Sequence, residues 1–331
     1  MNMQKRHFLY IAILAAVLAF GVVMLGAYVR LSQAGLGCPD WPGCYGHATV
    51  PTAEQAAAVD AARPLEAARA WKEMIHRYFA GTLATLILIL AVAAWVRRKE
   101  PGQPLLLPTL LLALVVFQAL LGMWTVTLLL FPPVVMGHLL GGFATFAVLV
   151  LLVMQTGGFL RLGAAATPAI RRLAALGLAV LICQVALGGW VSSNYAAIAC
   201  PDFPTCQGSF WPPMDFASAF SWHGLGIDYQ GGILANPARV AIHVVHRLGA
   251  LTVFLLLGAA ALLCLLKGKQ PALRGLGLLV LLLLCLQVAL GISLVEFGWP
   301  LPLADLHNGV AALLLGATVT LNWALWSGRA L

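Results

Sequence analysis

Cysteines and histidines, which often bind metals or carry redox chemistry, recur at matching places in the two halves of this chain. The segment Cys38-Pro-Asp-Trp-Pro-Gly-Cys44 returns as Cys200-Pro-Asp-Phe-Pro-Thr-Cys206. After each copy comes a His-Arg pair at the head of an apolar run, and then one more histidine near the start of a later run. The repetition predicts two related pockets, one in each half. Their residues are His76, Arg77 and His138 in the first half and His246, Arg247 and His307 in the second.

The repeated histidines fit heme iron better than zinc. A polar side chain within an apolar run that spans lipid is costly and usually functional. The alternative for a single buried histidine is a hydrogen bond to a neighbouring helix. Four histidines in duplicated register favour metal ligands or catalytic groups. Two facing imidazoles suit the axial positions of heme iron, whereas a zinc site takes about four ligands.

The two histidine motifs differ at one position that bears on catalysis. The first reads Glu73-Met-Ile-His76 and the second reads His243-Val-Val-His246. A residue three positions before a histidine shares its helix face, so a carboxylate in one pocket is replaced by an imidazole in the other. Glu73 is therefore a candidate proton acceptor, or a group that stabilises positive charge in a reacting substrate. For His243, an interfacial hydrogen bond and a functional role are both open.

Arg77 and Arg247 place one positive charge beside each histidine of the His-Arg pairs. A guanidinium binds carboxylates through two hydrogen bonds, so heme propionates are suitable partners. Lipid headgroups reached by snorkelling are the alternative. In the first half, an interfacial ion pair of Glu73 with Lys72 or Arg77 is a further alternative to a catalytic role for the carboxylate.

Each cysteine pair lies in a loop stiffened by prolines, outside the apolar runs. In an oxidising compartment, the pairs Cys38–Cys44 and Cys200–Cys206 favour a disulfide within each loop, and zinc is disfavoured because no further ligands are evident nearby. Such disulfides are either structural or able to exchange with a redox partner. Three further cysteines, Cys183, Cys264 and Cys285, are expected to pack as small hydrophobes within apolar helices.

The composition is that of an integral membrane protein, with 62% hydrophobic and only 9% charged residues. A soluble chain of this length needs far more charge to cover its surface. Apolar stretches of about 20 residues, enough to cross a bilayer core, recur along the chain and predict transmembrane helices. The first is expected to remain as an uncleaved helix. The eight predicted spans are 8–29, 74–95, 105–126, 134–155, 173–193, 241–265, 275–296 and 304–325.

The basic residues predict an orientation in the membrane and not a nucleic-acid partner, although the formal net charge is +8. With the N-terminus in the cytoplasm, the cytoplasmic segments hold 12 of the 19 basic residues and a single acid, Glu100. This distribution follows the positive-inside rule. We therefore expect cytoplasmic termini, extracytoplasmic cysteine loops, and all four repeated histidines toward the outer face.

The repeat predicts an all-α integral membrane fold made of two tandem four-helix bundles. Leu25-Gly26 aligns with Leu187-Gly188 at an offset of 162 residues, and Gln118 aligns with Gln287 at 169. An even number of spans in each half gives both halves the same orientation, related by a pseudo-two-fold axis along the membrane normal. A four-helix bundle can hold a cofactor between facing helices. The expected domains are residues 1–160 and 161–331.

In combination, these residues resemble the heme A synthase family, membrane enzymes that mature heme for cytochrome oxidases. The resemblance covers nearly the whole chain, and no single motif carries it alone. Its first part is Arg30-Leu-Ser-x-x-Gly-Leu-x-Cys38-Pro-Asp-Trp-Pro-x-Cys44, followed by Glu73-x-x-His76-Arg77 and His138. The second cysteine loop, His246-Arg247 and His307 complete it.

The resemblance implies an oxidoreductase that converts heme O to heme A. The reaction oxidises a ring methyl to a formyl group through successive hydroxylations, with electrons passed to a bound heme b. The first half would bind the heme O substrate, and the second would hold the heme b cofactor. The implied residues are Glu73 as the catalytic group, His76, His138 and Arg77 for the substrate, and His246, His307 and Arg247 for the cofactor.

The resemblance also implies a location in the bacterial plasma (inner) membrane. The expected partners are a heme O synthase that delivers the substrate and an electron acceptor, for which a quinone is a candidate. Two other functions also fit two heme sites: a non-catalytic diheme cytochrome b that exchanges electrons with quinone, and a heme exporter or chaperone. Glu73 favours the enzyme, because an electron carrier has no clear need for an acid–base group in one pocket only.

Overall fold

The computed structural model describes residues 3–162, 167–221 and 223–327, and within them the regular structure is helical. Eight of the described helices are long and apolar enough to cross a membrane. They are α1 (Met3–Leu31), α3 (Ala67–Val96), α4 (Leu106–Thr127), α5 (Pro132–Gly157), α6 (Pro168–Ser193), α8 (Asn236–Lys267), α9 (Pro271–Glu296) and α10 (Leu301–Trp326). The loops add α2 (Ala53–Val59), α7 (Phe216–Ala219) and a 3₁₀ turn, Ala197–Ala199.

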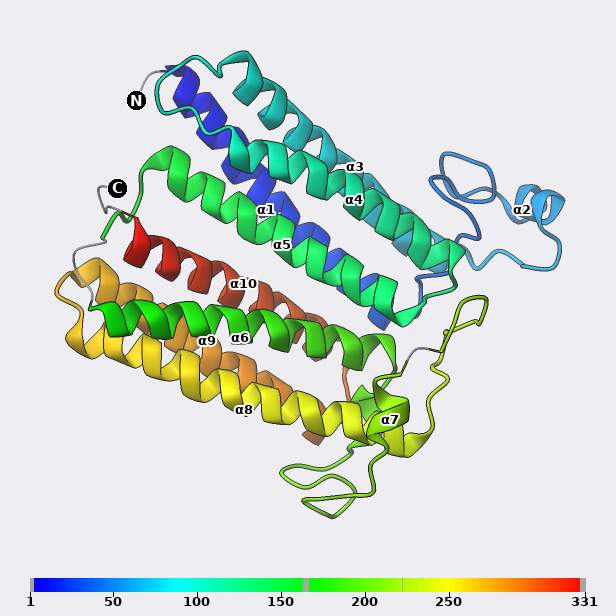
Figure 1. Ribbon diagram of the computed structural model, residues 1–331. Coiled ribbons are helices and arrows are strands. Elements are labelled where there is room, and N and C mark those ends of the chain that lie inside the picture. Colours follow the sequence, from blue (N-terminus) through cyan, green and yellow to red (C-terminus); the bar gives the residue numbers. More distant parts are fainter. Residues whose placement is uncertain (1–2, 163–166, 222, 328–331) are drawn as a thin grey trace.

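The eight predicted spans are confirmed, but several helices begin before their predicted spans, and α3 and α8 do so with charged first turns. Helix α3 begins at Ala67 and α8 at Asn236, several residues before the predicted spans. Their first turns hold charged residues, among them Lys72 and Arg239, which hydropathy excludes from a span. Backbone hydrogen bonding nevertheless continues through these turns, so both helices reach the cysteine loops (Figure 1).

Proline marks the start of five of the spans. It occupies the first turn of α5, α6, α8, α9 and α10. A proline there lacks only an N–H that has no partner within the helix, and its fixed φ suits the first turn. At α6 the cap is completed by Thr167, whose hydroxyl accepts the N–H of Ile170 at 3.4 Å. These prolines therefore mark in the sequence where each of the five helices begins.

The spans lie side by side in two sets of four (Figure 1). In the first set, α1 contacts α3 and α5, and α4 contacts the same two helices; in the second, α6 contacts α8 and α10, and α9 contacts α8 and α10. The sets meet where α10 contacts α1 and α5, and where α5 contacts α6. In the most apolar stretch of α10, 61% of the residues are buried inside the protein, against 22–33% in the corresponding stretches of the other spans. Helix α10 is therefore the most enclosed helix.

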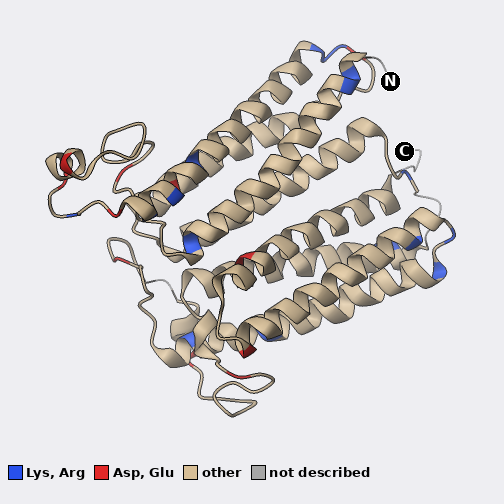
Figure 2. Ribbon diagram, turned by 180° about the vertical axis from the view of Figure 1, so that it is seen from behind, with Lys and Arg blue, Asp and Glu red and all other residues tan. Residues whose placement is uncertain are grey.

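Charged residues separate between the two ends of the helices. The start of α1 and the end of α10 lie at one end, and both cysteine loops lie at the other (Figure 1). Lysines and arginines gather at the first end, whereas nearly all aspartates and glutamates lie toward the loop end (Figure 2). One end of the helices is therefore rich in basic residues and the other holds most of the acidic residues, as expected for the two faces of a membrane protein.

Helices α8 and α9 approach closely at a glycine. A Cβ on Gly277 would come within 2.6 Å of the Ala261 carbonyl oxygen and within 2.9 Å of the Leu265 backbone nitrogen. Neither atom can swing aside, because both belong to the backbone. Gly275, on the same helix, would have no atom within 4 Å of such a Cβ. Small residues let membrane helices pack at short range, and Gly277 serves that purpose here.

Replacing Gly277 by alanine is expected to destabilise the protein by about 1–3 kcal/mol, because the added methyl overpacks the contact between α8 and α9. Thermal unfolding in detergent, followed by circular dichroism, measures the effect. The matched control, Gly275→Ala, should stay within about 0.5 kcal/mol of the unchanged protein. Equal stability of the two variants would contradict the close contact.

Candidate functional site

The four repeated histidines form two pairs. His76 on α3 lies near His138 on α5, and His246 on α8 lies near His307 on α10. All four residues are partly buried between spans. Each pair is drawn from a single set of four spans, so the protein contains two separate histidine sites.

Each imidazole lies against a glycine on a neighbouring helix. A side chain at any of these glycines would press on the ring, so the four glycines make room for the imidazoles between helices. In every case the nearest ring atom to a Cβ built on the glycine is Cε1. The pairs and their Cβ to Cε1 distances are Gly26–His76 (2.9 Å), Gly122–His138 (3.4 Å), Gly188–His246 (3.3 Å) and Gly291–His307 (3.2 Å).

The ring nitrogens fit iron of a heme. Nδ1 of His76, of His138 and of His307 is buried and has no hydrogen-bond partner. Such atoms are rare in folded proteins, so these three rings lack the hydrogen bond at Nδ1 that a structural histidine normally makes. The part of the chain that the structure describes holds no group of three or more His, Cys, Asp or Glu side chains placed for a metal ion. Pairs of imidazoles suit the two axial positions of heme iron and do not suit a four-ligand zinc site.

Glutamines contact both histidines of the second pair, a feature to which the motif analysis assigned no role. Nε2 of Gln184 on α6 lies 3.1 Å from Nδ1 of His246 and donates to the His246 carbonyl oxygen at 3.0 Å. Nε2 of Gln287 on α9 lies 3.1 Å from Nε2 of His307. Each glutamine stands four residues before the glycine that its histidine contacts. This Gln-x-x-x-Gly pattern is the signal by which the sequence could have identified them.

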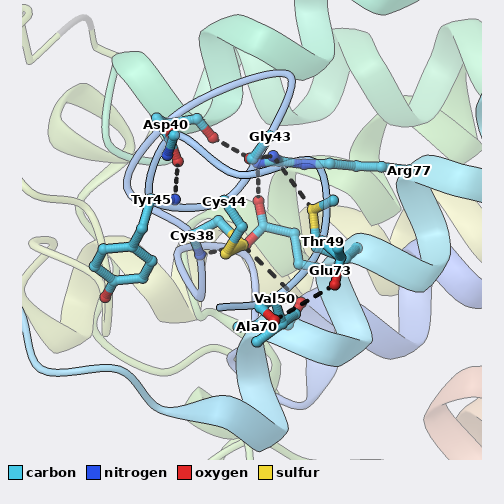
Figure 3. The surroundings of a disulfide bond; sticks show 12 residues. Cys38, Asp40, Gly43, Cys44, Tyr45, Thr49, Val50, Ala70, Glu73 and Arg77 are labelled. Carbon is cyan, nitrogen blue, oxygen red and sulfur yellow. Dashed lines mark hydrogen bonds and ion pairs between the residues drawn. A yellow bond between two sulfur atoms is a disulfide. The ribbon is translucent and has the colours of Figure 1, made fainter. Parts of the chain in front are cut away.

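Glu73 lies beneath the first cysteine loop and is bound from two sides (Figure 3). Its Oε1 pairs with Arg77 at 2.5 Å, and its Oε2 accepts the Cys38 N–H at 2.9 Å. Only 5% of Glu73 is exposed. Of the two basic neighbours, Arg77 forms the ion pair, while Lys72 lies over the ring of Tyr28. The loop and the helix together hold a buried carboxylate one turn from His76.

The two arginines of the His-Arg pairs fasten the cysteine loops to the helices below them. Each guanidinium donates to several loop carbonyl oxygens, so each loop is tied to the helix that carries a site histidine. Binding of heme propionates by these arginines stays a prediction. The acceptors are Asp40 (3.0 Å), Pro42 (3.2 Å) and Gly43 for Arg77, and Thr205 (2.7 Å), Asp202 (2.8 Å) and Cys200 (3.5 Å) for Arg247.

Both predicted disulfides are present, between Cys38 and Cys44 and between Cys200 and Cys206. All four of these cysteines are buried within their loops. Among the other cysteines, Cys264 is buried within α8. Cys183 and Cys285 are exposed, so the expectation of close packing is wrong for these two: their helix positions face outward, away from the other spans.

An aspartate closes each cysteine loop from within. In both loops the carboxylate of the Cys-Pro-Asp motif accepts two backbone N–H groups that follow the second cysteine. The Thr205 hydroxyl and these amides hold the pKa of Asp202 below its ordinary value. Its contacts therefore stabilise the loop at neutral pH and are lost only as the pH falls through that lowered pKa. The donors are Tyr45 and Gly46 for Asp40, and Gln207 and Gly208 for Asp202.

His243 replaces Glu73 in the second motif but binds a different segment. It is 3% exposed, and its Nδ1–H donates to the Ala196 carbonyl oxygen at 3.1 Å. Its ring also meets the edge of Trp299 at a centroid distance of 5.7 Å. The interfacial hydrogen bond expected as one alternative is therefore formed. The second site has no carboxylate at the position that Glu73 occupies in the first.

Replacing Arg77 by glutamine should loosen the first cysteine loop, because a neutral amide cannot replace charge-assisted bonds to three carbonyl oxygens. We expect the Cys38–Cys44 disulfide to be reduced about tenfold faster by a water-soluble phosphine, since each lost bond to a charged group contributes about 1.5–3 kcal/mol. Trapping of the released thiols and mass spectrometry measure the rate. The control is Arg69→Gln, which removes an exposed ion pair with Glu66 on the same helix. Equal rates for the two variants would contradict the fastening role.

Comparisons with known proteins identify the family of this chain. A model of the COX15-CtaA family, described as cytochrome oxidase assembly protein, matches residues 9–319. A heme A synthase of Shewanella oneidensis is 46% identical over 316 residues, which cover 92% of each chain. Heme A synthases of Caulobacter sp. (strain K31) and Halalkalibacterium halodurans are each 27% identical and cover 93% and 88% of both chains. Because the family model spans nearly all of the sequence, this chain belongs to the cytochrome oxidase assembly protein family.

Proposed function

We propose that this protein acts as a heme A synthase, an oxidoreductase that oxidises a ring methyl of heme O to a formyl group through successive hydroxylations. One observation carries the proposal: the described residues hold two partly buried histidine pairs, and buried Glu73 stands one turn before His76 where the second motif has His243. An enzyme that changes one heme and retains another needs two such sites of unequal chemistry. The 46% identity to a heme A synthase supports the same function.

One set of spans would bind the substrate, and the other would hold the cofactor. Residues 1–160 would bind heme O near His76 and His138, and residues 161–331 would hold a resident heme b between His246 and His307. Heme b, when bound, would supply one-electron transfer. The contacts of α1, α3, α4 and α5 match those of α6, α8, α9 and α10, which supports two bundles related by a pseudo-two-fold axis.

Glu73 is the proposed catalytic group of the substrate site. It lies on the same face of α3 as His76, one turn before it, and Arg77 supplies the opposite charge. Its carboxylate would accept a proton, or stabilise positive charge, beside the reacting methyl group. The Cys38 N–H and Arg77 together fix the orientation of both carboxylate oxygens. The loop therefore contributes to the reaction by positioning Glu73.

The proposed orientation places both termini in the cytoplasm and both cysteine loops outside a bacterial inner membrane. The gathering of basic residues at one end of the helices supports it (Figure 2). Both histidine sites then lie toward the outer face, which suits electron passage from substrate to resident heme. With water as the source of the oxygen atom, each oxidation step of the methyl group releases electrons and protons, so an acceptor is required, and a quinone is the candidate. A heme O synthase would supply the substrate.

The function is tested by expressing the protein in cells that make heme O but no heme A. We expect heme A, or its hydroxylated precursor, among the extracted hemes when they are separated by chromatography and identified by mass. Heme O alone, despite good expression of a heme-containing protein, would contradict the enzyme and leave electron transfer or heme export as the function.

In the same cells, Glu73→Gln should retain bound heme and lose conversion by about 10²- to 10⁴-fold, the usual contribution of a general acid or base. The control is Glu66→Gln, which alters an exposed carboxylate at the start of the same helix. Loss of the resident heme in the Glu73 variant would show that the cofactor site has been assigned to the wrong set of spans. Full conversion by that variant would remove Glu73 from the mechanism.

A further inference from the structure

We infer that Gln184 makes the second histidine pair a retaining site, and that Val22, at the matching position, leaves the first pair able to release its ligand. The inference deepens the proposed function, on which it rests, because a substrate must leave and a resident cofactor must stay. It concerns a positioning residue that acts through His246, and it assigns a physical cause to the difference between the two sites.

Gln184 lies between α6 and α8, in direct contact with His246. Its Nε2 donates to the His246 carbonyl oxygen at 3.0 Å and lies 3.1 Å from Nδ1 of the ring. The backbone contact fixes the amide on α8, and the ring contact then limits rotation of the imidazole. Gly249 admits the amide, because a Cβ on Gly249 would collide with Gln184. Two helices thus hold one ring through a single side chain.

An amide can hold this ring in either neutral tautomer. In the structure Nδ1 accepts an N–H from Gln184, while Oε1 of Gln184 is buried without a hydrogen-bond partner. A neutral imidazole that binds iron through Nε2 carries its proton on Nδ1. A flip of the amide exchanges the bond to the His246 carbonyl oxygen for one from that proton to Oε1, so the same residue can accept it. A partner on the far ring nitrogen orients a metal-binding histidine and raises its basicity as a ligand.

The first site lacks this partner. With Gly26 aligned to Gly188, as in the sequence repeat, the residue that matches Gln184 is Val22. Val22 packs against the hydrophobic core and offers no hydrogen-bonding group. Nδ1 of His76 is buried and has no partner, whereas Nδ1 of His246 has one. His76 therefore keeps its glycine contact but is free of the restraint that holds the ring of His246.

Reciprocal substitutions test the inference on the full-length, heme-loaded protein in detergent. Gln184→Val should release heme to excess apomyoglobin about tenfold faster, the lower end of the usual effect of removing such a partner. Its heme should also have a higher midpoint potential, because the histidine becomes a weaker electron donor. Val22→Gln should slow release of heme O from the first site by a similar factor. Gln155→Val, an exposed glutamine on α5, is the matched control.

The outcomes separate the inference from the proposed function. Unchanged release rates and potential in both variants, in a protein that still makes heme A, would overturn the inference alone. Unmodified protein that binds no heme would overturn the proposed function and the inference with it. If Gln184→Val does not fold, Val22→Gln decides the matter, since slower release of heme O supports the inference and unchanged release contradicts it.

Discussion

The placement of four imidazole rings between apolar helices, with ring nitrogens out of reach of water, is the constraint on which the two sites depend. A ring nitrogen without a partner is costly in a medium that offers no water, so each ring needs either a protein partner or a ligand. The protein meets the requirement unequally: His246 has Gln184, whereas Nδ1 of His76 has no partner. The glycines against the rings show that the space was shaped around imidazoles.

The cysteine loops are part of the sites because charged side chains tie them to the helices. Arg77 and Arg247 each bind loop carbonyl oxygens from the turn that carries a site histidine. In the first loop, the Cys38 N–H also binds Glu73, so the disulfide, the loop and the carboxylate form one connected unit (Figure 3). The second loop has the same anchor without a carboxylate. The two loops thus share the same anchor, and the residue three positions before the histidine differs, with Glu73 in the first motif and His243 in the second.

The sequence predicts the features that depend on local pattern and misses those that depend on tertiary contact. Span number follows from apolar length, and each disulfide follows from two cysteines in one short loop. The long starts of α3 and α8 were missed because hydropathy excludes their charged first turns. The loop contacts of Arg77 were missed because a guanidinium has several plausible partners until the loop is folded. Gln184 was missed because a single amide in an apolar helix carries little weight in a motif.

The central claim is that the two histidine pairs hold different hemes, one exchangeable and one resident. Heme analysis of purified His76→Ala and His246→Ala proteins tests it most directly. The account predicts that the His76 variant keeps its heme b and fails to bind added heme O, while the His246 variant loses heme b. Loss of heme b from the His76 variant, with retention in the His246 variant, would contradict the account.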